Sequence, residues 1–421
     1  MKTKQYPVLQ TFATRTNLIS LMLVVEVTYL VAKFINARYQ QSASGLNDWL
    51  WLVSDPPWQA NGTLYEIQPL WGTHYFGDLQ DLLTSASWAN PWGLSPTQHL
   101  PVGLAIVSIF GVFGQGLTAA TFIAASCALF FGLVHVWMRG ETVSLKLVTS
   151  MTLLPLNLSA LLVLDRGNLL LIAIPLLGIA IHRLLIDEKG DIGTVMCLVI
   201  AVSLKSFLLL PVLSTLFISR KTHKVFAKFL AVFGVVNLIL MYSYSGSLIK
   251  NFNTLFSTTL QFANQEPMET ALRSGSSLYR LSLELPNPWS IINPEKIPIG
   301  IVSGLIWLLL VISVLLMKRV PLWMKIVAAF STVQMVVTGG PYVLVWGIMA
   351  AFTLPTKNET RDLRSPTIAI LVTIAVLTNN LPIPNKLVFS ALAWTTVIFT
   401  IIVCYSNPGL YLRKVEHKKI V

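Results

Sequence analysis

Long runs of apolar residues, separated by short polar segments, occupy most of the chain between residues 17 and 406. The apolar residues within each run are continuous and do not alternate with polar ones, which favours helices over the strands of a β-barrel. One helical crossing of a bilayer takes about 20 apolar residues, and many of these runs approach that length. The pattern therefore predicts an all-α, polytopic membrane protein with about ten to thirteen transmembrane helices.

Two of the runs are interrupted near their centres. Lys205 lies in the middle of the run at 193–218, where a bare ammonium group in lipid would cost several kcal/mol. Gly339-Gly340-Pro341 interrupts the run at 326–354, and neither glycine nor proline continues a helix well. We therefore expect each run to form two half-helices, because a loop at membrane depth is tolerated only where it lines a water-filled cavity.

Two longer polar segments divide the chain, which we expect to form one membrane domain over residues 1–421. The first polar segment is rich in tryptophan, which prefers the headgroup level, so we expect amphipathic helices on the bilayer surface there. The expected parts are a first span at 17–36, an outer catalytic loop at 37–99, core spans at 100–245, a second outer segment at 246–297 and C-terminal spans at 298–421.

The net charge of +12 would suggest a nucleic-acid partner in a soluble protein. Here 54% of the residues are hydrophobic, only 11% are charged, and the basic residues cluster in short tails and loops. That distribution follows the positive-inside rule and predicts a multi-pass protein of the plasma membrane with both termini in the cytoplasm. We expect no nucleic-acid partner, and the three cysteines, all in apolar runs, imply no disulfide framework.

The polar residues expected on the outer side combine carboxylates with cations. Asp78 and Asp81 lie in the first outer loop, and Lys205 lies at the first helix break. Lysine and arginine bind phosphate, and a positioned carboxylate can take the proton of a hydroxyl group. The histidines are scattered and match no metal-ligand spacing, and no Walker-type glycine loop is present. Solvated loop carboxylates and an ion pair between Asp165 and Arg166 remain alternative interpretations.

Several short motifs resemble those of one enzyme family. Asp78-Leu79-Gln80, Asn90-Pro91-Trp92 and Leu100-Pro101 resemble the outer-loop pattern of polyprenol-phosphate-dependent mannosyltransferases of the GT-C superfamily, above all the bacterial glycosyltransferase 87 family. Further resemblances follow in the same order along the chain, at Arg166-Gly167-Asn168-Leu169-Leu170-Leu171, Ala201-Val202-Ser203-Leu204-Lys205, Ser274-Gly275-Ser276-Ser277-Leu278 with Arg280, and 338–346. The family's proline after the lysine is Ser206 here, and its late histidine has no counterpart.

The resemblance implies a hexosyltransferase of the GT-C type. It would move a sugar, most often mannose, with inversion from a polyprenyl-phosphate donor to an outer-leaflet glycolipid or lipoglycan. Asp78 would be the general base, and Lys205, with Arg166 or Arg280, would hold the donor phosphate. The residues on the acceptor side or behind the base would be Asp81, His99, Asn168 and Tyr342. No cofactor beyond the lipid-linked donor is implied, and whether a divalent metal assists is left open.

Two other functions fit parts of the pattern. Broken helices with a lysine near the midplane are also typical of transporters, so the chain could be a transporter or flippase of lipid-linked sugars. A structural subunit of an envelope-polysaccharide complex that has lost catalysis is the third interpretation. The clustered aspartates of the first outer loop favour the transferase, because a transporter has no evident use for them.

Overall fold

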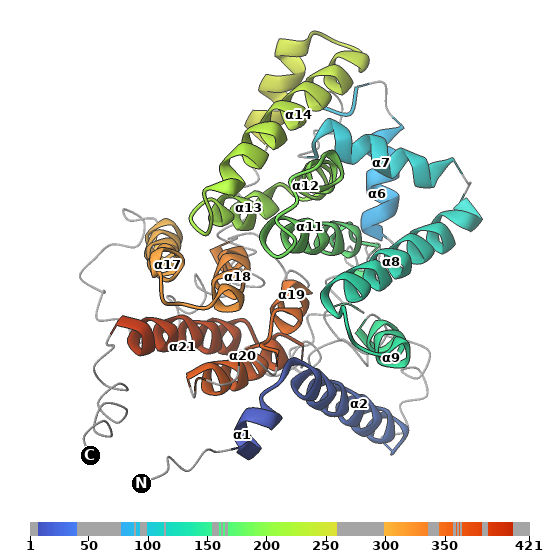
Figure 1. Cartoon of the computed structure of the whole chain (residues 1–421). Coiled ribbons are helices and arrows are strands. Elements are labelled where there is room, and N and C mark those ends of the chain that lie inside the picture. The colour runs from blue at the N-terminus through green and yellow to red at the C-terminus, as the bar shows by residue number, and fades with distance from the viewer. Residues whose placement is uncertain are drawn as a thin grey trace, which may run out of the picture.

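The computed structural model describes residues 7–39, 77–87, 90–92, 99–112, 115–153, 160, 163–164, 167–258, 299–335, 345–356, 359, 362, 364–380 and 386–406. In these ranges the chain forms helices and turns and no strand, so the expected all-α class is confirmed there (Figure 1).

The helices of the first half are α1 (Pro7–Phe12), α2 (Arg15–Tyr39), α6 (Gly77–Ala86), α7 (Pro101–Gly111), α8 (Gln115–Trp137), α9 (Val143–Leu153) and α11 (Leu170–Leu185). Those of the second half are α12 (Ile192–Leu204), η1 (Ser206–Leu208), α13 (Leu209–Thr215), α14 (Lys221–Ser243), α17 (Ile299–Leu316), α18 (Leu322–Ser331), η2 (Thr332–Met335), α19 (Gly347–Phe352), α20 (Arg364–Asn380) and α21 (Lys386–Ser406).

Within the described residues, three helices are long and apolar enough to cross a membrane: Leu117–Trp137, Lys221–Ser243 and Phe389–Ser406. Their outward faces carry large apolar side chains. On α14, Val235 and Ile239 are 55% and 63% exposed. Apolar side chains exposed in this way on a long helix suit contact with lipid rather than water. The fold is consistent with an all-α membrane protein.

An antiparallel hairpin of α11 and α12 lies at the centre of the bundle, with α8 packed along α11 (Figure 1). Asp191 begins α12 because its side-chain oxygen Oδ1 accepts the backbone N–H of Thr194 at 2.9 Å. In this hairpin the start of α11, after Asn168, lies at the same end of the bundle as the end of α12, before Lys205. We call this end of the bundle the Lys205 end. The opposite end, where α12 begins, is called the Asp191 end.

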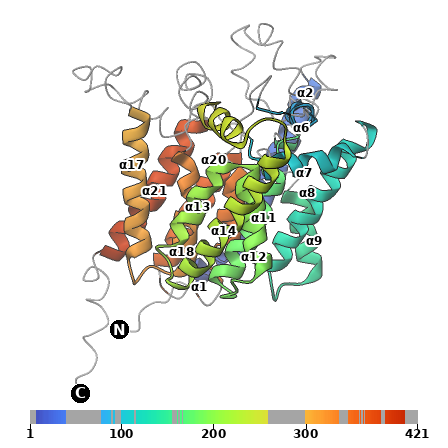
Figure 2. The ribbon, with the colours of Figure 1, turned by 90° about the horizontal axis from the view of Figure 1, so that it is seen from above.

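The run at 193–218 is broken at Lys205, as predicted, into α12 and α13. The second interrupted run forms α18 and η2 before the interruption and α19 after it, whereas residues 336–344 lie outside the described residues. Because α13 packs against α18 and η2, the two interrupted runs are in direct contact (Figure 2). The sequence did not indicate this contact.

The helix α14 begins among basic residues, ahead of its apolar run. Its first residue is Lys221, and Lys224 and Lys228 lie in its first turns. Lysine is a good helix former, and its long apolar stem lets a helix start before the apolar run does. The lysines therefore belong to the helix.

The crossing of α7 and α12 is unusually close. A Cβ atom added to Gly103 of α7 would lie 2.7 Å from the carbonyl oxygen of Ser203 on α12. A backbone atom cannot swing aside as a flexible side chain can, so the crossing requires glycine at residue 103. Small residues allow helices in lipid to approach in this way. The contact is made at Ser203, shortly before the helix break at Lys205.

We predict that Gly103→Ala separates α7 from α12 and destabilises the folded protein by about 1–3 kcal/mol, the usual range for overpacking. Gly234→Ala on α14 is the matched control, because a Cβ there would meet nothing within 4 Å. It should be neutral or slightly stabilising. Thermal unfolding of both variants in detergent measures the difference. Equal melting temperatures for the two variants would contradict the close crossing.

Candidate functional site

The break at Lys205 separates two apolar helices. The first, α12, ends at Leu204, and Lys205 adopts an extended backbone with φ −144° and ψ 99°. Pro211 lies in the first turn of the second, α13, where a missing N–H costs no bond within the helix. The chain then restarts through η1, where the Leu208 N–H donates to the Lys205 carbonyl at 3.0 Å. A partly exposed lysine thus lies between two apolar helices.

Two of the predicted site residues are brought together at this break. His99, in the segment before α7, lies close enough to Lys205 for the lysine's charge to act on its imidazole ring. Burial, and to a lesser extent that charge, lower the pKa of His99 from 6.5 to about 3. The imidazole is therefore neutral at physiological pH, and it can accept or donate a hydrogen bond without adding a second positive charge.

Asn237 of α14 fastens α14 to α7 and α12 below the break. Its Oδ1 accepts the backbone N–H of Val102 at 3.2 Å, and its Nδ2 lies 3.4 Å from the Ser203 hydroxyl oxygen. The Val102 N–H belongs to the first turn of α7, which has no partner within its own helix. Asn237 therefore positions the start of α7, and with it His99, beside Lys205. The sequence signal was a polar residue inside an apolar run.

Asn168, predicted on the acceptor side, lies at the Lys205 end, where α11 begins. Its side chain is 3% exposed, and its Oδ1 accepts the backbone N–H of Leu170 at 3.1 Å. This contact satisfies one of the amide groups at the helix start. Asn168 therefore has a structural role in holding the first turn of α11 level with the break.

The two predicted carboxylate residues, Asp78 and Asp81, both belong to α6. That helix packs against α7, and a Cβ atom at Gly111 would lie 2.9 Å from a methyl group of Leu83. The helix that carries the candidate base thus lies against the helix that begins beside Lys205. The side chains of both aspartates lie outside the described residues, as do the predicted residues Arg166, Arg280 and Tyr342.

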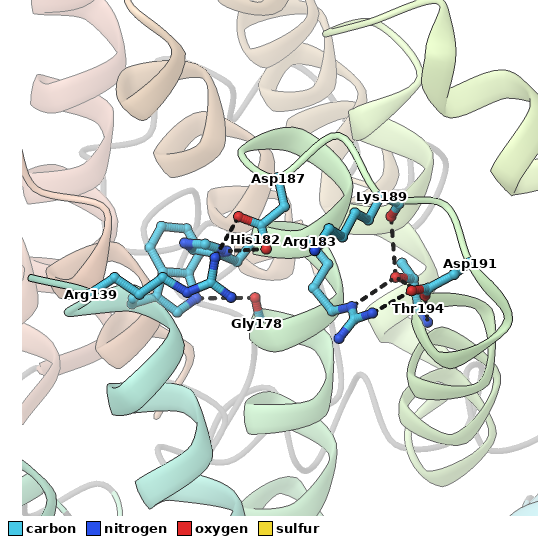
Figure 3. Close-up of polar contacts among 9 residues, drawn as sticks. Arg139, Gly178, His182, Arg183, Asp187, Lys189, Asp191 and Thr194 are labelled. Carbon is cyan, nitrogen blue, oxygen red and sulfur yellow. Dashed lines mark hydrogen bonds and ion pairs between the residues drawn. The ribbon is translucent and has the colours of Figure 1, made fainter.

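A second polar cluster lies at the Asp191 end (Figure 3). Arg139 pairs with Asp187 at 2.8 Å, and Arg183 pairs with Asp191, which also accepts from Thr194. The backbone N–H of Thr194 contributes most to lowering the pKa of Asp191 to about 2, and Arg183 contributes less. The sequence alone shows that these residues are charged, but it does not show that they form pairs that join α8, α11 and α12.

Arg15, at the start of α2, closes the same end of the bundle. Its Nε donates to the Leu354 carbonyl at 2.9 Å, and its Nη1 donates to the Trp137 carbonyl at 2.7 Å. The indole of Trp137 in turn donates to the Gly178 carbonyl at 3.1 Å and packs edge-on against His182. These contacts join helix ends from distant parts of the chain, so we interpret this end as structural bracing.

The described residues contain no group of three or more His, Cys, Asp or Glu side chains that could hold a metal ion. Among the described residues, the chemistry at the Lys205 end is that of an ammonium group near a neutral imidazole. Such a set can bind an anion and shield its charge.

The low pKa of His99 gives a prediction for pH dependence. Below pH 6.5 the unfolded chain protonates this histidine and the folded one does not, so stability falls as the pH drops from about 6.5 to about 3. His99→Gln should remove part of that slope. Melting temperature measured against pH for the wild type and the variant tests this, with His223→Gln, at an exposed position, as the control. An unchanged slope in His99→Gln would show that the ring is not buried.

Comparison of the chain with protein-family models, with curated proteins and with solved structures found no match. Function is therefore inferred from the residues at the Lys205 end and from their surroundings.

Proposed function

We propose that the protein is a membrane glycosyltransferase of the GT-C type. It moves a sugar, most often mannose in the family that the sequence resembles, from a polyprenyl-phosphate donor to a glycolipid or lipoglycan acceptor. The observation that carries the proposal is the helix break at Lys205, where an ammonium group between two apolar helices lies close to His99. A phosphate attached to a lipid tail is a substrate whose charge belongs at such a break while its chain stays in lipid.

The proposal assigns each end of the bundle to one side of the membrane. Lys189, Arg220 and Lys224, all exposed, lie around the Asp191 end, which the positive-inside rule assigns to the cytoplasm. The Lys205 end then faces outward, together with the loops on either side of α6. With an even number of spans within the expected range of about ten to thirteen, both termini would be cytoplasmic.

In the proposed reaction the acceptor hydroxyl attacks the anomeric carbon of the donor sugar and the bond to the phosphate oxygen breaks, with inversion. Asp78 takes the hydroxyl proton. Lys205, with Arg166 or Arg280, neutralises the charge that grows on the leaving phosphate. Asp81 and Tyr342 support the acceptor or the base, and Asn168 holds the first turn of α11. Neutral His99 hydrogen-bonds to substrate without repelling the ammonium group.

We predict that Lys205→Met lowers sugar transfer by about 10²–10³-fold, the usual loss when one group that stabilises developing charge is removed. Lys205→Arg should keep part of the activity because it keeps the charge. The measurement is transfer of labelled mannose from polyprenyl-phosphate mannose to lipid in proteoliposomes. Lys250→Met is the control, because Lys250 is exposed outside the break. Wild-type transfer by Lys205→Met would rule out the assigned role.

A second prediction concerns the base. Asp78→Asn keeps the shape of the side chain but cannot take a proton, so transfer should fall by about 10²–10⁴-fold. Asp81→Asn should have a smaller effect, because we place it behind the base. The control is Glu188→Gln, an exposed carboxylate at the Asp191 end whose pairing with Lys221 is solvent-exposed. If Asp78→Asn and Glu188→Gln transfer sugar equally well, Asp78 is not the base.

A transporter or flippase of lipid-linked sugars is the second candidate. The contact between the two interrupted runs favours it, because interrupted helices meeting inside a bundle are typical of transporters. The bonds of Arg15 at the Asp191 end count against it, since they would have to break for that end to open. Movement of a labelled lipid-linked sugar across proteoliposomes without its chemical conversion would favour the flippase.

A further inference from the structure

The end of α14 and the segment that follows it have an unusual composition. Residues 242–247 read Tyr-Ser-Tyr-Ser-Gly-Ser, and residues 244–247 connect α14 to the helical residues 248–258. The helix ends where Tyr244 turns to an extended backbone with φ −82° and ψ 151°, and Gly246 has a φ of +103°, which favours glycine. We call residues 244–246 the Tyr244 turn.

Buried residues pack against this turn and hold it in place. The ring of Trp92, 1% exposed, lies edge-on to the ring of Tyr244 with centroids 5.1 Å apart. Asn251, also 1% exposed, donates from Nδ2 to the Ser245 carbonyl at 3.3 Å. A Cβ atom at Gly246 would lie 3.2 Å from Nδ2 of Asn90 and 3.0 Å from Oδ1 of Asn251. The turn is therefore fixed in place, with two side-chain amides against its glycine.

The turn adjoins the helix break through Trp92. The indole N–H of Trp92 donates to the carbonyl of His99 at 3.4 Å, and the imidazole of His99 is within reach of the charge of Lys205. Asn90 belongs to the same small structure, because its Oδ1 accepts the backbone N–H of Trp92 at 3.2 Å. The Tyr244 turn is therefore connected, through Trp92 and His99, to the group that we assign to the donor phosphate.

The chemistry of the turn suits a sugar. Tyrosine offers a rigid ring with a hydroxyl group at low entropic cost, and serine, glycine and asparagine add adaptable hydrogen bonding, the combination that binding loops use on polar ligands. The C–H groups of a sugar pack on an aromatic ring, and its hydroxyls pair with amides and serines. A tyrosine at a helix end can also be an interfacial anchor, a role that fits Tyr242, which is 79% exposed.

We propose that the Tyr244 turn, with Asn90, is a carbohydrate-binding subsite that holds the acceptor sugar beside Lys205. That this sugar is an acceptor rests on the proposed function, whereas sugar binding at the turn does not. Tyr244, partly exposed above Trp92, provides the ring, and Asn90 and Ser245 provide the polar contacts.

Binding of simple sugars to the full chain in nanodiscs tests this subsite. The probes are the methyl glycosides of mannose, glucose and galactose, followed by saturation-transfer NMR, with sorbitol as the non-cyclic control. We expect Tyr244→Ala to weaken binding of the preferred glycoside by about tenfold or more, which corresponds to about 1.4 kcal/mol. Tyr242→Ala is the matched control and should bind as the wild type does. Lys205→Met should also keep sugar binding, since we assign it to the phosphate.

Tyr244→Phe tests whether a folding defect explains the loss of binding in Tyr244→Ala, because it keeps the ring against Trp92 and removes only the hydroxyl group. It should melt as the wild type does and bind with intermediate affinity. The subsite is overturned if none of the three glycosides binds the wild type, or if Tyr244→Ala and Tyr242→Ala bind them equally well. Sugar binding that depends on Tyr244 without any transfer from the lipid-linked donor would refute the proposed function and keep the subsite. If sugar transfer depends on Lys205 but sugar binding does not depend on Tyr244, the subsite is refuted and the proposed function is kept.

Discussion

The positive charge of Lys205 is the constraint that the helices around it have to accommodate. An ammonium group costs several kcal/mol in lipid, so it needs a polar opening and cannot lie on a continuous apolar helix. The break between α12 and η1 leaves Lys205 partly exposed at the end of α12. The first amides of α7 and α11 are already bonded to Asn237 and Asn168, so these contacts position the two helix starts near the lysine. The expected ligand is accordingly an anion.

The two ends of the bundle differ in the kind of polar contact that they contain. At the Asp191 end, the described charges are largely paired with one another, as Arg139 is with Asp187. At the Lys205 end, the described contacts are mostly between neutral groups, such as those of Asn237 and Trp92. Paired charges neutralise each other and hold helix ends together, whereas hydrogen bonds between neutral groups position the segments around Lys205. The division fits the proposal that the protein is braced at one end and binds its substrate at the other.

The sequence predicted the features that depend on local chemistry. Continuous apolar runs predicted the helices, and a lysine in the middle of an apolar run predicted the break between α12 and α13. It could not predict that His99 lies near Lys205, or that Asn237 fastens α14 to α7, because packing brings together segments that are far apart in the chain. The apolar run also does not mark where α14 begins, because lysines enter that helix before the run starts. The roles of Asp78, Arg166, Arg280 and Tyr342 remain predictions.

The bonds of Arg15 have a consequence for biosynthesis. The arginine precedes Leu354 by 339 residues, yet its Nε donates to the carbonyl of Leu354, and its backbone N–H donates to the carbonyl of Pro355 at 2.8 Å. Neither bond can form until the chain has been synthesised through α19. Until then α2 lacks these partners, so an early helix waits for a late one. Chains that stop before residue 354 should therefore remain open at the Asp191 end, where cellular quality control can recognise them.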